Sequence, residues 1–419
     1  MTSGRTTSMP LTAPTVPVDH GKDAAPPTRQ STRFLYLYAL AAAGGAVAYV
    51  PFLTILLPVR VSSLTGEDAV SVLAYTAFAG ATAASLANIA FGWLSDLTGD
   101  RRPWIVAGLV LSCLLLLSVS TATSVPVLIG VIVLWQICLN MMLAPLAAWA
   151  GDLVPDSQKG LLGGLLSFAP ALGALSGALV TLPAMASPDE RLGLVAAMVI
   201  GLVLPALLFG APRPMPQLMA RREPAEADES KAATGGTAVA RMWLARLLVQ
   251  IAEAMLFAYL LLWFRSIEPG YSDNDTATLL FIVLGVGVPL ALLTGRWSDK
   301  ADRPIAPLAA GAGIAAVGLL VMALAPSLTL AIAGYVVFGL ASTVFLALHS
   351  SQTLRVLTKP QTRGRDLGLF NLTNTVPSLI MPWFALALVP AFGFAALFLL
   401  LSGLALLACI LLLSIARRT

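Results

Sequence analysis

One face of an apolar segment carries the residues whose chemistry is least expected in such surroundings. Arg246, Gln250, Glu253 and Phe257 are spaced four, three and four residues apart, which places them on one face of a helix. Glu253 lies roughly 16 Å along that helix, at about 1.5 Å per residue. Removal from water disfavours a charged carboxylate, so we predict that Glu253 exchanges a proton or recognises a cation. The alternative is a structural carboxylate neutralised by Arg246 or by a neighbouring helix.

Further polar side chains recur at helical spacing in three other apolar segments. Gln136 and Asn140 stand one helical turn apart, Tyr335 and His349 share a face of a later segment, and Tyr38 lies in the first one. These residues and the face of Glu253 are candidate contacts for a ligand. A lining of amides and aromatic rings favours an amphipathic organic ligand, or a sugar, over an inorganic ion. Each residue taken singly is equally compatible with an interhelical hydrogen bond.

Two similar charged stretches interrupt the apolar segments. The first, from Gly92 to Ile105, reads GWLSDLTGDRRPWI, and the second, 203 residues later, reads GRWSDKADRPI from Gly295 to Ile305. Both contain G-x-x-S-D, then D-R, then a proline. A second pair of stretches, PDSQKGLLG from Pro155 and PQTRGRDLG from Pro360, lies 205 residues apart. Two offsets that agree so closely predict a duplication of one half of the chain.

The elements that must position these residues are membrane-spanning helices. Of the 419 residues, 58% are hydrophobic and 11% are charged, with a mean hydropathy of +0.86, which excludes an ordinary soluble domain. About 20 apolar residues cross a hydrocarbon core of about 30 Å. We predict twelve such spans, near residues 34–59, 69–94, 104–121, 125–150, 161–183, 192–211, 242–264, 275–296, 304–324, 327–351, 367–388 and 392–415.

The basic residues predict the orientation of these spans. With the N-terminus inside, 22 of the 25 lysines and arginines fall in the N-terminal tail, the inner loops or the C-terminus. We therefore expect both termini in the cytosol. The predicted organisation is a disordered cytosolic tail over 1–33, a six-helix bundle over 34–211, a cytosolic linker over 212–240 and a second six-helix bundle over 241–419. The basic residues set the orientation of the spans and contact anionic lipids of the inner leaflet. Their number therefore does not indicate a nucleic-acid partner, and none is expected.

At this point the chain resembles the major facilitator superfamily. The family's loop between helices 2 and 3 reads G-x-L-x-D-x-x-G-x-[RK], and Gly92, Leu94, Asp96, Gly99 and Arg101 match it, although Leu97 and Asp100 depart from the basic residues common there. The resemblance implies an all-α integral membrane fold of twelve helices in two six-helix bundles. It also implies that spans 1, 4, 7 and 10 surround a central path, so the polar faces that carry Tyr38, Gln136, Glu253 and Tyr335 would line that path.

The resemblance further implies a conformational gate in the charged loops. Asp96 and Arg101, with Asp152 as a counter-charge, would latch the bundles in the outward-open state, helped by the turns at Gly92 and Gly99. By the repeat, Asp299 and Arg303 would act in the same way from the second half. A carboxylate can accept hydrogen bonds from the N-terminal amides of a neighbouring helix. The competing interpretation is a pair of hydrophilic loops that only obey the bias of basic residues toward the inside.

No signature of an enzyme, cofactor or metal site is present in the sequence. The two histidines, His20 and His349, make no metal cluster, and no phosphate-binding glycine loop occurs, so energy is expected from a proton gradient. The predicted protein is a monomeric transporter of the cell membrane with a small-molecule substrate.

Two short motifs point to opposite directions of transport. Ala169, Pro170, Gly173 and Ala174 resemble a motif of the family's exporters, whereas Arg101 to Ile105, R-R-P-W-I, resembles its glycoside symporters. We favour proton-coupled efflux of an amphipathic compound, a drug or secondary metabolite. Proton-coupled uptake of a sugar or glycoside is the alternative, and a non-transporting scaffold or receptor is the third.

Overall fold

The chain is described by a computed structural model that covers residues 29–183, 185–188, 190–215, 232–301, 303, 305–356 and 363–416. Over these residues the secondary structure is helical throughout, without a strand. The first part comprises α1 (Thr32–Pro51), the π-helical turn η1 (Phe52–Leu56), α2 (Leu57–Thr65), η2 (Gly66–Asp68), α3 (Ala69–Thr98), α4 (Arg102–Ser118), η3 (Val119–Thr121), α5 (Val125–Leu153), α6 (Asp156–Leu166), α7 (Ala169–Val180) and α8 (Arg191–Phe209). The second part comprises α10 (Ala232–Ile267), α11 (Asp273–Ala301), α12 (Ala306–Ala323), α13 (Leu328–Val356) and α14 (Arg363–Ala416).

Ten helical segments among the described residues are long and apolar enough to cross a membrane. Two of them, Thr32–Thr98 with 67 residues and Thr373–Ile415 with 43, are each long enough for two crossings. The first contains the turn at η2, and the second is kinked at Gly393, whose φ of 73° lies in the left-handed region that favours glycine. By length and composition, the described helices are therefore sufficient for twelve crossings.

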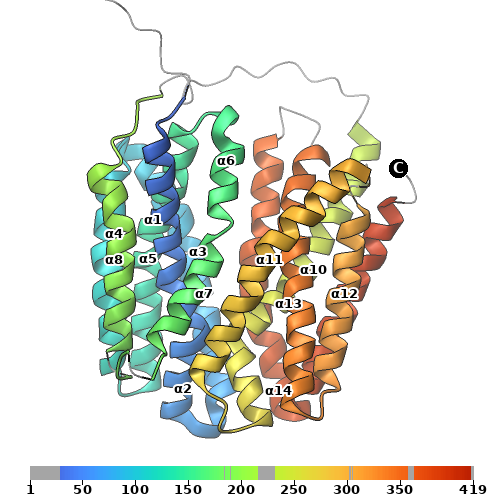
Figure 1. Cartoon of the computed structure of the whole chain (residues 1–419). Helices are drawn as coiled ribbons and strands as arrows, with labels where there is room; N and C mark the ends of the chain where they lie inside the picture. The colour runs from blue at the N-terminus through green and yellow to red at the C-terminus, as the bar shows by residue number, and fades with distance from the viewer. Residues whose placement is uncertain are drawn as a thin grey trace, which may run out of the picture.

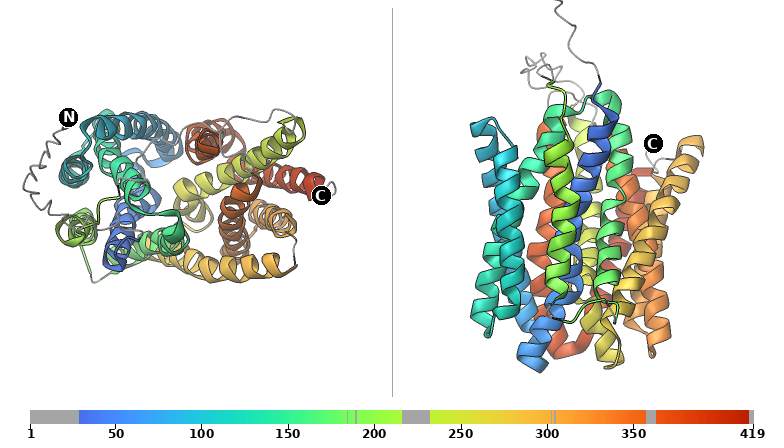
Figure 2. Two further views of the ribbon diagram at one scale, coloured as in Figure 1. Left: turned by 90° about the horizontal axis from the view of Figure 1, so that it is seen from above. Right: turned by 60° about the vertical axis from the view of Figure 1, so that its left-hand side comes forward.

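The helices gather in two groups (Figure 1). Seen from above, α1 to α8, in blue to green, lie on one side, and α10 to α14, in yellow to red, lie on the other (Figure 2). We call these groups the first and second halves. The end of the molecule where α1 begins and α14 ends, at the top of Figure 1, is called the termini end, and the opposite end is called the far end.

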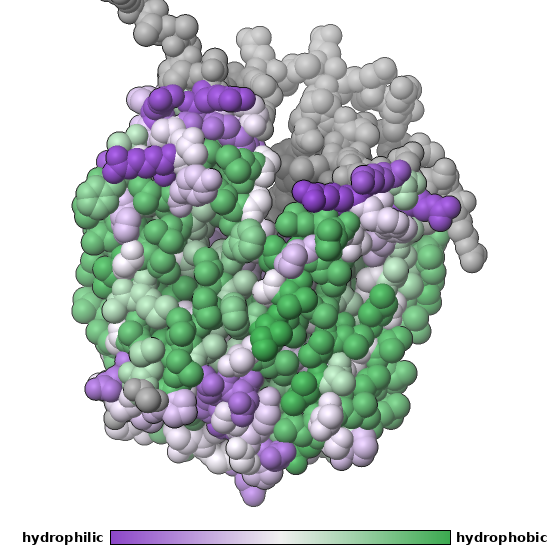
Figure 3. All heavy atoms as spheres, viewed as in Figure 1, coloured by the Kyte–Doolittle hydropathy of each residue, from purple (hydrophilic) through white to green (hydrophobic). Residues whose placement is uncertain are grey.

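On the face shown in Figure 3, an apolar belt lies between polar residues above and below it. Large hydrophobic side chains are exposed on the described helices, among them Leu86, Trp93 and Leu293 at 65%, 62% and 62% exposure. Such exposure would be unfavourable in water, but it matches a lipid environment. The surface is that of a multi-pass membrane protein.

Three boundaries differ from those predicted from the sequence. The fifth span is split into α6 and α7 just before Pro170, whose ring cannot continue a helical hydrogen-bond ladder. Helix α10 begins at Ala232, inside the stretch predicted as a linker. Residues 1–28 of the predicted tail lie outside the described residues, whereas Gln30 is 3% exposed. Its side-chain amide donates to the carbonyls of Leu153 at 3.1 Å and Arg213 at 3.0 Å, so the tail's last residues pack onto the first half.

Candidate transport site

A cavity of about 620 Å³ lies between the two halves. Helices α1, α3 and α5 of the first half and α10 and α14 of the second half contribute its walls. On α3 the lining residues recur on one helical face and most of them are small, which leaves room for a ligand: Thr76, Ala77, Gly80, Ala81, Ala84, Ser85 and Asn88. The volume lies within the range of pockets that hold small molecules.

Three amide side chains form the polar part of the first-half wall. Asn88 on α3 donates to Asn140 Oδ1 on α5 at 3.1 Å, and Asn140 donates to the Gln136 backbone carbonyl at 2.9 Å. Gln136 and Asn140 both line the cavity, and each is less than a tenth exposed. The structure therefore brings together the two residues that helical spacing had singled out on the fourth span.

Glu253 lies in the middle of α10, beside two cavity-lining residues, Ala254 and Phe257. Arg246, Tyr49 of α1 and Tyr335 of α13 lie within electrostatic range of its carboxylate. Its carboxylate takes part in no hydrogen bond or ion pair with any described residue. The carboxylate is therefore half-buried and without a fixed partner among the described residues.

Arg246 does not neutralise Glu253 through a direct ion pair. Its guanidinium donates to Gln250 Oε1 at 3.1 Å, to Thr373 Oγ1 at 3.0 Å and to Asn374 Oδ1 at 3.3 Å. Gln250 also donates to Asn374, at 2.9 Å. This group ties α10 to the start of the eleventh span in α14, and through Asn374 it reaches the cavity wall.

Three residues predicted to line the pathway are placed elsewhere. The Tyr38 hydroxyl donates to the Leu146 carbonyl at 3.0 Å in the interior of the first half. The His349 ring is fully buried, with Nε2 2.9 Å from the Met242 carbonyl. Tyr335 is buried near Glu253, but it is absent from the described cavity wall. Both His349 and Tyr335 lie on the tenth span, which the resemblance had assigned to the central path.

Spans 2 and 11 contribute walls of the described cavity, whereas span 10, which was expected to line it, contributes none of the described lining residues. The most informative residues that sequence reasoning missed are Asn88 on α3 and Asn374 on α14. Two signals were available: Asn88 is an amide inside an apolar span, and small residues precede it at helical spacing.

The helices α3 and α14 also meet directly across the halves, since the rings of Phe78 and Trp383 lie 5.1 Å apart.

The first charged loop forms an ionic cluster at the termini end. Arg101 contacts Asp96 at 2.5 Å and Asp152 at 2.9 Å, and its Nη1 donates to Ser95 Oγ at 2.7 Å. Burial acts to lower the pKa of the Arg101 guanidinium, but hydrogen bonds to Asp152 and Asp96 outweigh it and raise that pKa. The cluster joins the loop after α3 to the end of α5.

The ionic cluster lies within the first half, whereas the sequence had suggested a latch between the halves. Asp96 is paired with Arg101 in the part of the chain that the structure describes, so the expected helix N-terminal amides are not its partners there. Gly99 ends α3 with a left-handed φ of 69°, a position that favours glycine. Gly92 has open space around it, so no close helix approach depends on it.

The second charged loop is described only in part. The side chain of Asp299 lies outside the described residues, and Arg303 is exposed. The Ser298 hydroxyl donates to the Arg303 carbonyl at 3.2 Å, which closes the turn between α11 and α12. Whether Asp299 and Arg303 repeat the cluster around Arg101 stays a prediction.

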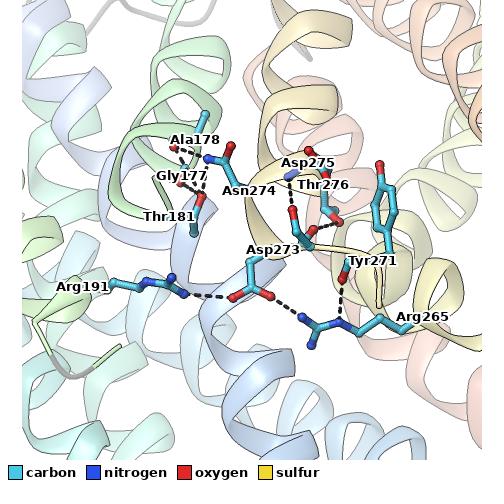
Figure 4. Close-up of polar contacts among 11 residues, drawn as sticks. Gly177, Ala178, Thr181, Arg191, Arg265, Tyr271, Asp273, Asn274, Asp275 and Thr276 are labelled. Carbon is cyan, nitrogen blue, oxygen red and sulfur yellow. Dashed lines mark hydrogen bonds and ion pairs between the residues drawn. The ribbon is translucent and has the colours of Figure 1, made fainter. Parts of the chain in front are cut away.

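At the far end, an aspartate joins the two halves (Figure 4). Asp273, at the start of α11, accepts from Arg191 of the first half at 2.9 Å and also pairs with Arg265 of its own half. Next to it, Asn274 donates to the Ala178 carbonyl at 2.7 Å and to Thr181 Oγ1 at 3.0 Å on the first half. We call this group the far-end clamp: Arg191, Arg265, Asp273 and Asn274.

Hydrogen bonds between the halves, counted over the described residues, lie toward the far end. Besides the far-end clamp, the Tyr259 hydroxyl donates to the Val70 carbonyl at 3.4 Å. No hydrogen bond between described residues joins the halves at the termini end. The two halves are therefore fastened at the far end.

Comparison with known proteins points to one family. A sequence model of the Major Facilitator Superfamily matches residues 34–356 and 242–419. An uncharacterized MFS-type transporter of Mycobacterium tuberculosis, from the strains CDC 1551 / Oshkosh and ATCC 25618 / H37Rv, is 27% identical over 236 residues. That match covers 54% of the chain and 51% of the relative, so the chain spans about half the length of the curated relatives it matches.

Two solved structures share the fold over nearly the whole chain. The crystal structure of a D-xylose-proton symporter superposes with a TM-score of 0.67 at 14% identity, covering 91% of this chain and 96% of that one. A bacterial homolog of the human lysosomal transporter Spinster, in an inward-facing and occupied conformation, gives 0.65 at 15% identity, covering 92% and 96%. At these identities the likeness concerns the fold alone.

Proposed function

The chain belongs to the major facilitator superfamily of membrane transporters, and from this premise we propose that it exports a small amphipathic organic compound in exchange for protons. The observation that carries the proposal is Glu253. It is an acidic residue in the middle of a membrane span, next to the cavity, without a hydrogen bond or ion pair among the described residues. An acidic residue inside a membrane span costs free energy, and residues of this kind commonly mark an ion or substrate pathway.

The position of Glu253 suits coupling. Its electrostatic partners come from both halves, Tyr49 from the first and Tyr335 from the second. When the halves rock against each other, the surroundings of the carboxylate change, and its proton affinity changes with them. A proton taken up on one side of the membrane is then released on the other.

The composition of the cavity wall favours an amphipathic substrate over a sugar. Most of its lining side chains are apolar or aromatic, including Leu53, Leu57, Ile132 and Phe257. A sugar requires hydrogen-bonding groups around most of its surface, whereas an amphipathic compound requires a few. The small-residue motif around Gly173 supports export, and the D-xylose specificity of one structural relative keeps uptake as the competing outcome.

The open and closed ends fit one step of an alternating-access cycle. With the termini in the cytosol, as the basic residues predict, the far-end clamp closes the outer side and the cavity belongs to an inward-facing form. In this proposal the cluster around Arg101 is rearranged when the inner side closes.

The experiment that tests the proposal records internal pH in membrane vesicles of both orientations. A panel of amphipathic drugs and glycosides is added to vesicles that contain the parent protein or Glu253→Gln. We expect a drug to release protons from acid-loaded inverted vesicles. We expect Glu253→Gln to abolish this release because a glutamine side chain does not bind and release protons as a carboxyl group does. Vesicles without the protein give the background leak.

Each other outcome selects a different function. Proton entry into right-side-out vesicles on addition of a glycoside identifies a symporter and overturns export. Drug-dependent proton release that survives in Glu253→Gln overturns the role of Glu253. No proton movement with any compound, with the protein verified in the membrane, favours a scaffold or receptor.

A further inference from the structure

We propose that the cavity selects uncharged, mainly apolar compounds that carry a carboxamide or a similar donor–acceptor pair, and that Gln136 is the residue that recognises this group. The inference rests on the proposed transport function and names the substrate class of the same cavity. The family and the fold do not specify a substrate, and this inference does.

Gln136 has an unused side-chain amide in a place where an amide requires a partner. The residue is 9% exposed, lies on α5 and lines the cavity. Neither its oxygen nor its nitrogen takes part in a hydrogen bond with a described residue; only its backbone carbonyl is used, by Asn140. The amide atoms of Gln136 are not among the fully enclosed polar atoms that lack a partner, so they are accessible from the cavity, where a ligand can bind them.

Asn88 adds a second, weaker group on the same wall. Its nitrogen donates to Asn140 Oδ1 at 3.1 Å, which leaves the Asn88 oxygen facing no donor among the described residues. This wall therefore presents one complete amide and one extra acceptor. A primary carboxamide offers the matching set, because its oxygen accepts from Gln136 while its two N–H bonds donate to Gln136 and Asn88.

The rest of the wall disfavours other ligand classes. No lysine, arginine, aspartate or glutamate is among the described residues that line the cavity, and Glu253 beside it is assigned to the proton in the proposed function, so a permanently charged ligand would lack a counter-charge there. The hydroxyls of Thr76 and Ser85 donate to the carbonyls of Val72 and Ala81 within α3, at 2.7 and 2.8 Å. On α3 and α5, polar recognition is thus left to the amide side chains around Gln136.

Aromatic rings complete the site. Tyr49 and Phe257 both line the cavity, and their ring centroids lie 6.3 Å apart across the two halves. A flat apolar body can pack against these rings while its polar group faces Gln136. The chemical class is therefore a flat, neutral compound with one carboxamide.

The test measures binding of two fluorescent probes to the purified full chain in lipid nanodiscs. The probes are 1-pyrenecarboxamide and 1-acetylpyrene, which have the same ring and carbonyl but differ in the N–H donors. Empty nanodiscs correct for partition into lipid. We expect the parent to bind the carboxamide about tenfold more tightly, because a site built for a hydrogen-bonding group rejects the analogue that lacks it.

Variants separate recognition of the carboxamide from loss of the fold, and the parent separates it from proton coupling. Gln136→Leu should bring the two dissociation constants to near equality, while Ser112→Ala, a buried hydroxyl on α4 bonded to Leu109 away from the cavity, should keep the difference. Proton release by the parent is recorded beside probe binding. A parent that moves no protons with any compound but keeps the carboxamide preference would overturn the proposed function and leave this inference standing.

Three results overturn the inference. They are absence of binding by both probes, equal binding of the two probes by the parent, and an undiminished preference in Gln136→Leu. A circular dichroism spectrum and gel filtration of each variant verify the fold, and Gln136→Met provides a second test if the leucine variant is unstable. Methionine keeps the approximate length of the side chain but removes both the acceptor oxygen and the N–H donors, so this variant should also lose the preference.

Discussion

At the scale of single residues, Tyr38 is a polar side chain whose hydrogen bond is already used inside the fold. It is 3% exposed, donates to the Leu146 carbonyl at 3.0 Å and packs against the ring of Phe34. Tyr38→Phe keeps the ring and removes that one hydrogen bond. We expect the variant to lose about 1 kcal/mol of stability, the net value of a typical hydrogen bond.

The measurement compares thermal unfolding of the purified variant with drug-dependent proton release in vesicles. A lower unfolding temperature with an unchanged rate of proton release supports the structural role of Tyr38. The reverse pattern, an unchanged unfolding temperature with a lost rate, would restore Tyr38 to the pathway.

The residues on the polar stripes differ in how well sequence spacing placed them. Gln136 and Asn140 reach the cavity as predicted by their one-turn spacing, and Glu253 lies beside it. The spacing of Tyr38 and His349 was equally regular, yet their faces meet backbone carbonyls of neighbouring helices. Periodicity identifies a face of a helix, but the neighbour on that face depends on tertiary packing.

At the scale of helices, Gly108 shows how close packing of α4 on α5 depends on a missing side chain. A Cβ at this position would lie 2.4 Å from the Met142 nitrogen and 2.8 Å from the Met141 carbonyl carbon, both backbone atoms. We expect Gly108→Ala to destabilise the protein by about 1–3 kcal/mol, the range for overpacked sites. Thermal unfolding in detergent measures the change.

The matched control is Gly201→Ala in α8, an exposed helical glycine with no atom within 4 Å of the added Cβ. Alanine favours a helix by about 1 kcal/mol over glycine, so this variant should equal or exceed the parent in stability. Equal unfolding temperatures for Gly108→Ala and Gly201→Ala would contradict the close contact between α4 and α5.

The helices themselves were largely predictable, because about 20 apolar residues specify a span wherever it lies. The breaks within the helices were less predictable. Pro170 interrupts the fifth span between α6 and α7, and the interruption depends on how the chain packs as well as on the proline. The role of α3 as a cavity wall was also missed, because its small residues suit a tight helix interface equally well.

At the scale of the molecule, the sequence predicts the two halves but not the end at which they meet. A transporter of this kind has two arrangements of similar free energy, and the charged loop from Gly92 to Ile105 is compatible with both. In this structure Asp273 joins the halves at the far end, and Arg101 pairs within the first half. Those contacts depend on the conformational state, which residue types alone do not specify.

The last prediction concerns the opening of the far end. An ideal Cβ at Gly177 on α7 lies 3.7 Å from the Cβ of Ala277 on α11, close to the average of about 3.8 Å in disulfides. In a chain whose three native cysteines are replaced by serine, Gly177→Cys with Ala277→Cys should form a disulfide across the halves on mild oxidation. Because that bond holds the far end closed, we expect oxidation to stop drug-dependent proton release and a reducing agent to restore it. The two single variants, which form no such bond, should work under both conditions. Full activity in the oxidised double variant, with the cross-link verified by mass spectrometry, would show that α7 and α11 do not separate during transport and would remove the far-end clamp from the cycle.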